Sequence, residues 1–225
     1  MLTGHVGELR RERVSASTYG GLKPSHDAGD ADMTTLENRP NTALLVVDVQ
    51  QSFQQRPYWR EDDVKPFLSQ VQKLIDKAAA SGIPVLQIFH VEEQDGPKGP
   101  FSSKSGYVKA LSALRISPAE VFHKDVHSAL YGRSVNGRTL EQWLRDFGIE
   151  HVIVTGIRTE QCCETTTRHA SDAGFKVTYA LDATLTFPMV SKSGRTFTPA
   201  ELMERTELVL NGRFADVVRA EAVAF

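Results

Sequence analysis

Residues 151–181, "HVIVTGIRTEQCCETTTRHASDAGFKVTYAL", indicate the fold class because their pattern is that of a strand, a helix and a strand in succession. Residues 151–157 form a short, β-branched apolar run that is typical of a strand buried on both faces. Residues 160–173 have a helical pattern that Gly174 ends, and residues 176–181 return to a strand pattern. This order predicts two parallel strands joined by a crossover helix.

The same alternation continues outward on both sides of this unit. Thr139 and Gln142 form the pattern of a capping box, and Asp63 can cap an earlier helix. The further strands are expected at residues 42–49, 83–91 and 120–124, and the further helices after Asp63, after Thr139 and over residues 198–212. This rhythm predicts a single α/β domain, with a mostly parallel sheet covered by helices on both faces in three layers.

Composition limits the classes of function. The chain has 225 residues, 40% of them hydrophobic, which suits one domain with a real core. A net charge of -2 gives no reason to expect nucleic acid or an anionic membrane as a partner. Residues 1–40 are polar and predict a flexible extension ahead of a domain over residues 41–225. Two adjacent cysteines make no disulfide framework and no secretory signal is visible, so a cytoplasmic location is expected.

Three polar residues follow the predicted strands at the positions where such sheets bind ligands, namely their carboxyl ends. Asp48 interrupts an apolar run, Lys124 ends "EVFHK", and Cys162 lies just after "HVIVTGI" at the start of a helix. Each has a plain structural alternative: a turn cap for Asp48, a solvated surface position for Lys124, and a small buried apolar residue for Cys162. Together they predict one pocket with chemical function.

The chemistry of these three groups is complementary. A cysteine in the first turn of a helix, here capped by Thr159, is expected to have a lowered pKa, and the thiolate is the nucleophilic form. An aspartate can take the thiol proton and later return it, and a lysine beside the pair favours both anions. We therefore expect Cys162 to act as nucleophile, Asp48 as general base and acid, and Lys124 as their electrostatic partner.

Three blocks of sequence, "ALLVVDVQQSF", "HKDVHSAL" and "VIVTGIRTEQCCETTTRHASDAGFKVTYALDAT", resemble the isochorismatase-like cysteine hydrolases. That family includes nicotinamidases, N-carbamoylsarcosine and ureidoacrylate amidohydrolases, and isochorismatase itself. The resemblance implies that the family's Asp–Lys–Cys triad corresponds to Asp48, Lys124 and Cys162. Its motif places the nucleophile three residues after Thr159, which selects Cys162 and leaves Cys163 as a core residue.

The resemblance also implies how the site is completed. The family has a non-proline cis peptide before the nucleophile, at the position of Ile157–Arg158 here, so the backbone N–H groups of Arg158 and Cys162 are expected to form an oxyanion hole. We expect Gln50, Phe53 and Trp59 to form the pocket wall. The Arg158 side chain can meet a substrate carboxylate or face solvent.

Departures from the family pattern narrow the expected activity. The nicotinamidase metal site contains an Asp-x-His pair after the second strand, and this chain has only His90 there, so we expect neither a metal nor another cofactor. Isochorismatases proper have glycine in place of the cysteine, so Cys162 favours cleavage of a carbon–nitrogen bond in a small amide or ureido compound. The alternatives are a vinyl ether hydrolase and a non-catalytic redox or binding protein with paired thiols. We also expect a homo-oligomer, either a dimer or a tetramer.

Overall fold

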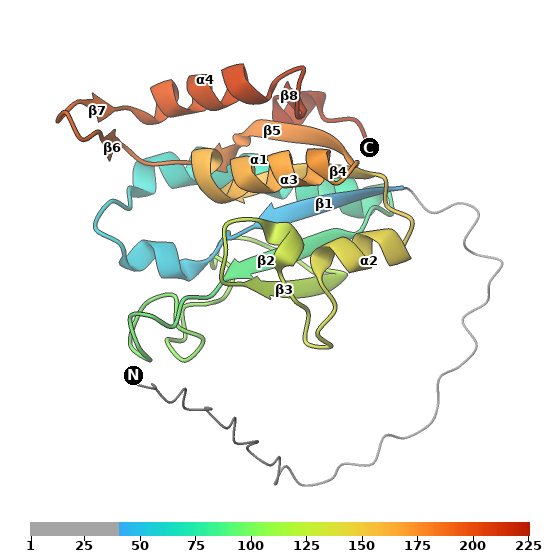
Figure 1. The fold of residues 1–225 in the computed structure, drawn as a ribbon, viewed down its shortest axis with the longest axis horizontal. Coiled ribbons are helices and arrows are strands. Elements are labelled where there is room, and N and C mark those ends of the chain that lie inside the picture. Colours follow the sequence, from blue (N-terminus) through green and yellow to red (C-terminus); the bar gives the residue numbers. More distant parts are fainter. Residues whose placement is uncertain (1–40) are drawn as a thin grey trace, which may run out of the picture. The chain divides into compact units, whose positions relative to one another are not determined.

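The computed structural model describes residues 41–225, which form a six-stranded parallel sheet with the strand order β3-β2-β1-β4-β5-β8 (Figure 1). The predicted extension, residues 1–40, lies outside the described residues. The strands of this sheet are β1 (Thr42–Val47), β2 (Val85–His90), β3 (Glu120–Lys124), β4 (His151–Ile157), β5 (Lys176–Leu185) and β8 (Asp216–Val218).

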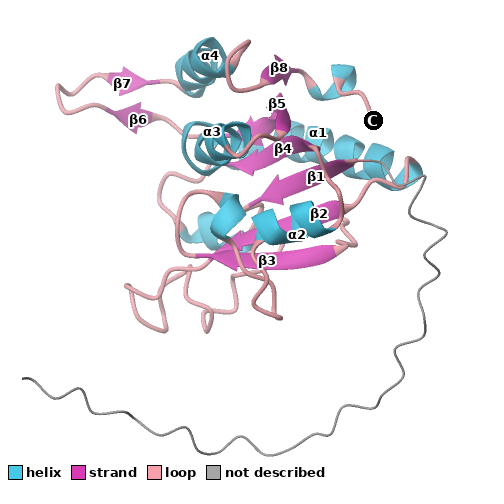
Figure 2. Ribbon diagram, turned by 45° about the vertical axis from the view of Figure 1, so that its right-hand side comes forward, coloured by secondary structure: helices cyan, strands magenta, loops and turns pink. Residues whose placement is uncertain are grey.

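Helices cover both faces of the sheet, so the predicted three-layer α/β architecture is confirmed (Figure 2). One face packs against α1 (Glu61–Ala80). The other packs against α2 (Leu140–Asp146) and α3 (Glu164–Asp172), and α4 (Pro199–Leu210) lies beside α3.

The two cores explain why β1 is apolar without alternation. All six of its residues are buried, and successive side chains of a strand point to opposite faces. Leu44 and Val46 pack in the core under α1, whereas Leu45 and Val47 pack in the core under α2 and α3. A strand that buries both faces favours apolar residues along its length. After Thr42, whose hydroxyl lies 3.3 Å from His151 Nδ1, the next polar residue is Asp48, directly after the strand.

Two of the observed helix starts agree with those predicted from the sequence, and two differ. The capping boxes at Thr139 and Thr198 are both formed. However, α1 begins at Glu61 with Arg60 as its N-cap, so the cap predicted at Asp63 is wrong. Asp63 lies instead in the first helical turn, where a negative charge interacts favourably with the helix dipole. The helix predicted at residues 160–173 begins as a π-helical turn, Thr159–Cys163, and continues as α3.

Several short elements were not predicted. The strands β6 (Met189–Val190) and β7 (Thr196–Phe197) form an antiparallel hairpin between β5 and α4, and β8 adds a sixth strand beside β5. Runs of two or three residues are too short to show a period. Among residues 41–225, no helix combines the length and the apolar character that a membrane span requires.

Candidate active site

The carboxyl ends of the four neighbouring strands β3, β2, β1 and β4 bring the predicted residues together. His90 at the end of β2 pairs with Lys124 at the end of β3, and Val47 of β1 pairs with Gly156 of β4. Asp48 follows Val47 directly. The π-helical turn that carries Cys162 starts two residues after β4 ends.

Asp48 sits in a sharp reversal of the chain. Its φ is 54°, in the left-handed region that aspartate tolerates better than most residues. Its backbone N–H donates to the carbonyl of Ile88 at 2.9 Å, and its carbonyl accepts from the N–H of Gln50 at 2.8 Å. The side chain is fully buried. The turn therefore holds the carboxylate inside the protein at the end of β1, beside the end of β2.

Lys124 connects the other two predicted residues. Its Nζ donates to Asp48 Oδ2 at 2.7 Å and to Cys162 Sγ at 3.4 Å. The side chains of Asp48 and Lys124 have no exposed surface, and buried charges persist only when they are paired. The structure thus brings the aspartate, the lysine and the cysteine into hydrogen-bond range around one ammonium group.

The environment keeps the lysine charged and the thiol protonated. Burial lowers the pKa of Lys124, but its interactions with Asp48 and then with Cys162 outweigh burial, and the net pKa is raised. Burial, and then the charge of Asp48, raise the pKa of Cys162 to about 12 against the opposing effect of Lys124. The expectation of a lowered thiol pKa is therefore wrong for the resting protein, because desolvation and Asp48 exceed the influence of Lys124.

One oxygen of Asp48 is left without a hydrogen bond. Lys124 occupies Oδ2, whereas Oδ1 is buried and has no partner among the described residues. An unpaired buried carboxylate oxygen is costly, so its presence calls for a functional explanation. Asp48 lies close enough to the Cys162 thiol to raise its pKa, so the thiol is a neighbouring group from which this carboxylate can accept a proton.

The turn between β4 and α3 contains the predicted cis peptide bond, between Ile157 and Arg158. The predicted cap at Thr159 is wrong, because its hydroxyl shares a hydrogen bond with the Thr184 hydroxyl at 2.8 Å instead of capping the helix. Tyr179 donates from its hydroxyl to the carbonyl of Thr159 at 2.8 Å. These bonds attach the turn to β5.

Gly156 is required where β4 passes β1. Its φ is 137°, and a Cβ atom placed there would lie 1.9 Å from the carbonyl oxygen of Val47. No side chain fits at such a distance. The glycine thus permits the close approach of the two strands immediately before Asp48.

Cys163 is a core residue, as predicted. It has no exposed surface, and burial raises the pKa of its thiol well above the usual value. It packs in the core under α2 and α3. Cys162 is 7% exposed, so it is the more accessible residue of the two.

The four predicted substrate contacts occupy different environments. Gln50 is fully buried, and its side-chain amide bonds both backbone groups of His90, at 2.7 Å and 3.0 Å. It therefore joins the ends of β1 and β2, which is a supporting role. Phe53 is buried with its ring edge-on to Phe101, and Trp59 packs against Phe187.

The side chain of Arg158 is largely buried and has protein partners. Its guanidinium lies 3.1 Å from the carboxylate of Glu160 and over the rings of Tyr58 and Phe187, at 5.3 Å and 5.7 Å. It thus does not simply face solvent. Tyr58 and Phe187, which were not predicted, belong with Trp59 to an aromatic cluster beside Arg158.

His90 is a further group at the site that was not assigned a role from the sequence. Its Nδ1 lies 3.3 Å from Lys124 Nζ. The reasoning that selected Asp48 and Lys124 applies to it equally, since it is the polar last residue of a buried strand. Among residues 41–225, no three histidine, cysteine, aspartate or glutamate side chains gather in a way that could hold a metal ion.

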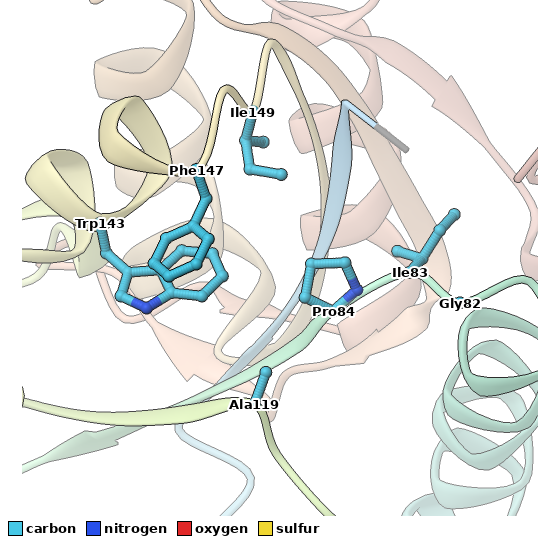
Figure 3. A pocket seen from close by; sticks show the side chains of 7 residues that line it. All are labelled: Gly82, Ile83, Pro84, Ala119, Trp143, Phe147 and Ile149. Atoms are coloured by element: carbon cyan, nitrogen blue, oxygen red, sulfur yellow. The ribbon is translucent and has the colours of Figure 1, made fainter. Parts of the chain in front are cut away.

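Two pockets lie at different edges of the sheet. One, of about 580 Å³, borders the end of β3 and has a polar wall that includes Lys124, His123 and Arg133. The other, of about 330 Å³, is apolar and lies at the amino ends of the strands, where Pro84 stands opposite Trp143 and Phe147 (Figure 3).

The sheet and its buried Asp–Lys–Cys cluster define a class of three-layer α/β proteins with a thiol site at the strand ends. Residues 42–200 match the family model described as the Isochorismatase domain, so the chain belongs to the isochorismatase family, whose members are hydrolases. The chain is 30% identical over 168 residues to Nicotinamidase 3 of Arabidopsis thaliana, a match that covers 68% of this chain and 79% of the relative.

Solved structures share the fold. A cysteine hydrolase from Pseudomonas syringae pv. phaseolicola superposes with a TM-score of 0.70 at 21% identity, covering 80% of this chain and 89% of that one. An N-carbamoylsarcosine amidase from Thermoplasma acidophilum gives a TM-score of 0.62 at 19% identity, covering 82% and 99%. Identities this low establish the common architecture, and the family assignment rests on the match over residues 42–200.

Proposed function

We propose that this hydrolase cleaves a carbon–nitrogen bond of a small amide or ureido compound through a thioester on Cys162. The observation that carries the proposal is the free Oδ1 of Asp48, buried beside a protonated thiol while Lys124 holds the other oxygen. The relatives named as a nicotinamidase and an N-carbamoylsarcosine amidase support this class of substrate.

In the proposed reaction, Asp48 accepts the proton of Cys162 as the sulfur attacks the carbonyl carbon of the substrate. The tetrahedral intermediate collapses when Asp48 returns that proton to the leaving nitrogen, which departs as ammonia or an amine. A water molecule then attacks the thioester with Asp48 again as base, and the acid is released as the thiol recovers its proton. The Lys124 ammonium, 3.4 Å from the sulfur, stabilises the negative charge that develops there.

The oxyanion of the tetrahedral intermediate needs hydrogen-bond donors. We assign this role to the backbone N–H groups of Arg158 and Cys162, which flank the turn that follows the cis peptide bond. Phe53, Trp59 and the Arg158 side chain are proposed as parts of the substrate-binding wall. Gln50 is assigned to supporting His90.

The proposal is tested by measuring ammonia release across a panel of small primary amides, ureido acids and nicotinamide, with wild type and Cys162→Ala side by side. Turnover of at least one compound by the wild type alone is expected. Because the segment after β2 lacks the Asp-x-His pair of the family's metal site, this turnover should also survive dialysis against EDTA.

Two results of the same panel would contradict the proposal. Activity that survives in Cys162→Ala, on an amide or on a vinyl ether added to the panel, would show that the sulfur is not the nucleophile. Reversible loss of thiol titre under mild peroxide without turnover of any compound would favour the redox alternative.

A further inference from the structure

We propose that His90 is a positioning residue: its neutral imidazole accepts the third N–H of the Lys124 ammonium and thereby holds that group between Asp48 and Cys162. This inference rests on the proposed function, in which Lys124 must stay aimed at both the carboxylate and the sulfur. It adds a fourth member to the site and makes the site sensitive to acid through that member.

The geometry around Lys124 Nζ carries the proposal. An ammonium group has three N–H donors and no acceptor. Within reach of Nζ lie Asp48 Oδ2 at 2.7 Å, Cys162 Sγ at 3.4 Å and His90 Nδ1 at 3.3 Å. Each of the three donors therefore has one partner, and the side chain of Lys124 has no exposed surface, so water is not a ready substitute. Without His90, one N–H of a buried cation would lack a partner.

The hydrogen bond defines the state of the imidazole. Because the ammonium can only donate, Nδ1 of His90 has to present a lone pair, and the ring proton has to be on Nε2. A proton on Nδ1 would remove the acceptor. It would also place a second positive charge 3.3 Å from Nζ.

The protein holds the backbone of His90 firmly. Gln50, itself fully buried, bonds its N–H and its carbonyl at 2.7 Å and 3.0 Å. The ring stands edge-on to Phe101, with centroids 5.8 Å apart. The role proposed for His90 also explains why a wholly internal glutamine follows Asp48 so closely.

The titratable groups that face His90 follow three strands. Lys124 and, last in size, His127 lower its pKa, whereas Asp48 and Glu92 raise it. Burial first, and then Lys124, lower the pKa of His90 below the usual value of 6.5. The neutral form is therefore favoured at neutral pH, and the hydrogen bond is lost only as the pH falls through that lowered pKa.

Nitrogen-15 NMR of the full chain labelled at histidine tests the tautomer and its coupling to Lys124. In the wild type, His90 should carry its proton on Nε2 and titrate below pH 6.5, its ordinary value. In Lys124→Met its pKa should rise, because a cation and a donor are removed together. His127→Asn, which removes an exposed neighbour of the same kind, is the matched control and should leave the tautomer unchanged.

A second measurement addresses position without relying on the stability of Lys124→Met. The rate at which iodoacetamide alkylates Cys162 is followed by mass spectrometry in wild type, His90→Asn and His90→Phe. His90→Phe, with no acceptor, should react roughly tenfold more slowly at neutral pH, the equivalent of one charge-assisted hydrogen bond. His90→Asn offers a carbonyl acceptor that cannot titrate, so its rate relative to wild type should rise as the pH falls from about 8 to 5.

These readouts separate this inference from the proposed function, because neither needs turnover. A proton on Nδ1, an unchanged His90 pKa in Lys124→Met, or a ratio of alkylation rates that stays constant with pH would overturn the role of His90, even if an amide is hydrolysed. If all three readouts come out as expected and no amide is cleaved, His90 still positions Lys124 and the proposed function fails instead.

Discussion

The two edges of the central sheet are opposite in chemical character. At the carboxyl ends of the strands, Asp48 and Lys124 are buried charges beside the Cys162 thiol. At the amino ends, the pocket around Pro84, Trp143 and Phe147 is well formed but has no ionisable side chain (Figure 3). The apolar pocket at the amino ends can thus bind an apolar group, but none of its side chains could transfer a proton or attack a carbonyl carbon.

The difference follows from the direction of the strands. In a parallel sheet every strand delivers its last residue to the same edge, so polar residues that end separate strands meet there. The amino ends receive the chain from helices and turns, as at Gly82 after α1 and Ile149 after α2. We therefore expect substitutions at the first edge to change chemistry and those at the second to change stability alone.

The largest effect is expected for Asp48→Asn. The amide cannot accept the thiol proton, and loss of a general base typically costs about 10²–10⁴-fold in rate. Adding Cys162→Ala should cause little further loss, because residues that act as a unit are not additive. Steady-state kinetics on the best substrate of the panel measure both. A double variant that loses the product of the two single effects would show that Asp48 and Cys162 act independently.

The pH dependence of Cys162 alkylation should show how far the protein raises the pKa of this thiol above that of a solvent-exposed cysteine. With its pKa raised to about 12, the thiol should react ever faster as the pH rises through 9 and 10. In the denatured chain the rate should level off near the ordinary thiol pKa of about 8.5. Since the unfolded chain loses its proton first, the contribution of this thiol to stability is present below that value and is lost as the pH rises toward 12.

A plateau of the native alkylation rate near or below neutral pH would contradict this expectation. It would show that the thiolate already exists in the resting protein, so that Lys124 outweighs burial and Asp48. The same measurement is made on Lys124→Ala. This variant should react more slowly than wild type, because it lacks the only cation within hydrogen-bond range of the sulfur among the described residues.

Gly156→Ala should destabilise the fold and disturb the site together. The added Cβ would lie 1.9 Å from the Val47 carbonyl, so the backbone before Asp48 must shift. Overpacking of this kind costs about 1–3 kcal/mol. The matched control is Gly82→Ala at the other edge, where φ is also positive but no atom lies within 4 Å. It should lose stability only through its backbone conformation and keep full activity in urea-unfolding and kinetic measurements.

Much of the site at the carboxyl edge could be predicted because it follows from local patterns. A continuous apolar run indicates a strand buried on both faces, and the polar residue that ends it can then be located, which is how Asp48 and Lys124 were found. Cys162 was found at the start of the helix that follows such a strand. The same rule would have selected His90, the last residue of β2. It was considered only as a member of a metal site and was thus missed as a partner of Lys124.

What could not be predicted depends on distances between strands. The requirement for Gly156 comes from its register opposite Val47, which no local pattern shows. The direction of the Cys162 pKa shift depends on how deeply three elements bury the sulfur, and the helix start alone suggested the opposite sign. Thr159 was expected to cap the helix because threonine is a common N-cap residue. Its hydroxyl instead shares a hydrogen bond with the hydroxyl of Thr184 on β5.

Cys163→Ser should separate the two neighbouring thiols. The serine hydroxyl would be buried in the core under α2 and α3 without an assured partner, at a cost of about 1 kcal/mol or slightly more. Hydrolysis and the alkylation of Cys162 should persist. The free energy of unfolding and the rate are compared with those of Cys162→Ser, which should show the reverse pattern. An exchange of the two phenotypes would mean that Cys163 is the nucleophile.

The smallest effect is expected at the amino edge, for Phe147→Ser. The ring of Phe147 is 42% exposed and stacks on Trp143 with centroids 4.2 Å apart, and such pairs contribute about 0.5–1.5 kcal/mol beyond burial. Replacement should therefore lower the free energy of unfolding by at least this amount, because the partial burial of the ring is lost as well, and urea titration can detect the change. Among the described residues, the side chains of Trp143 and Phe147 form no hydrogen bond or ion pair with Asp48, Lys124 or Cys162, so hydrolysis and the alkylation rate should equal those of wild type. A change in either rate would show that the pocket in Figure 3 is coupled to the chemistry across the sheet. The two edges would then have to be treated as one functional unit.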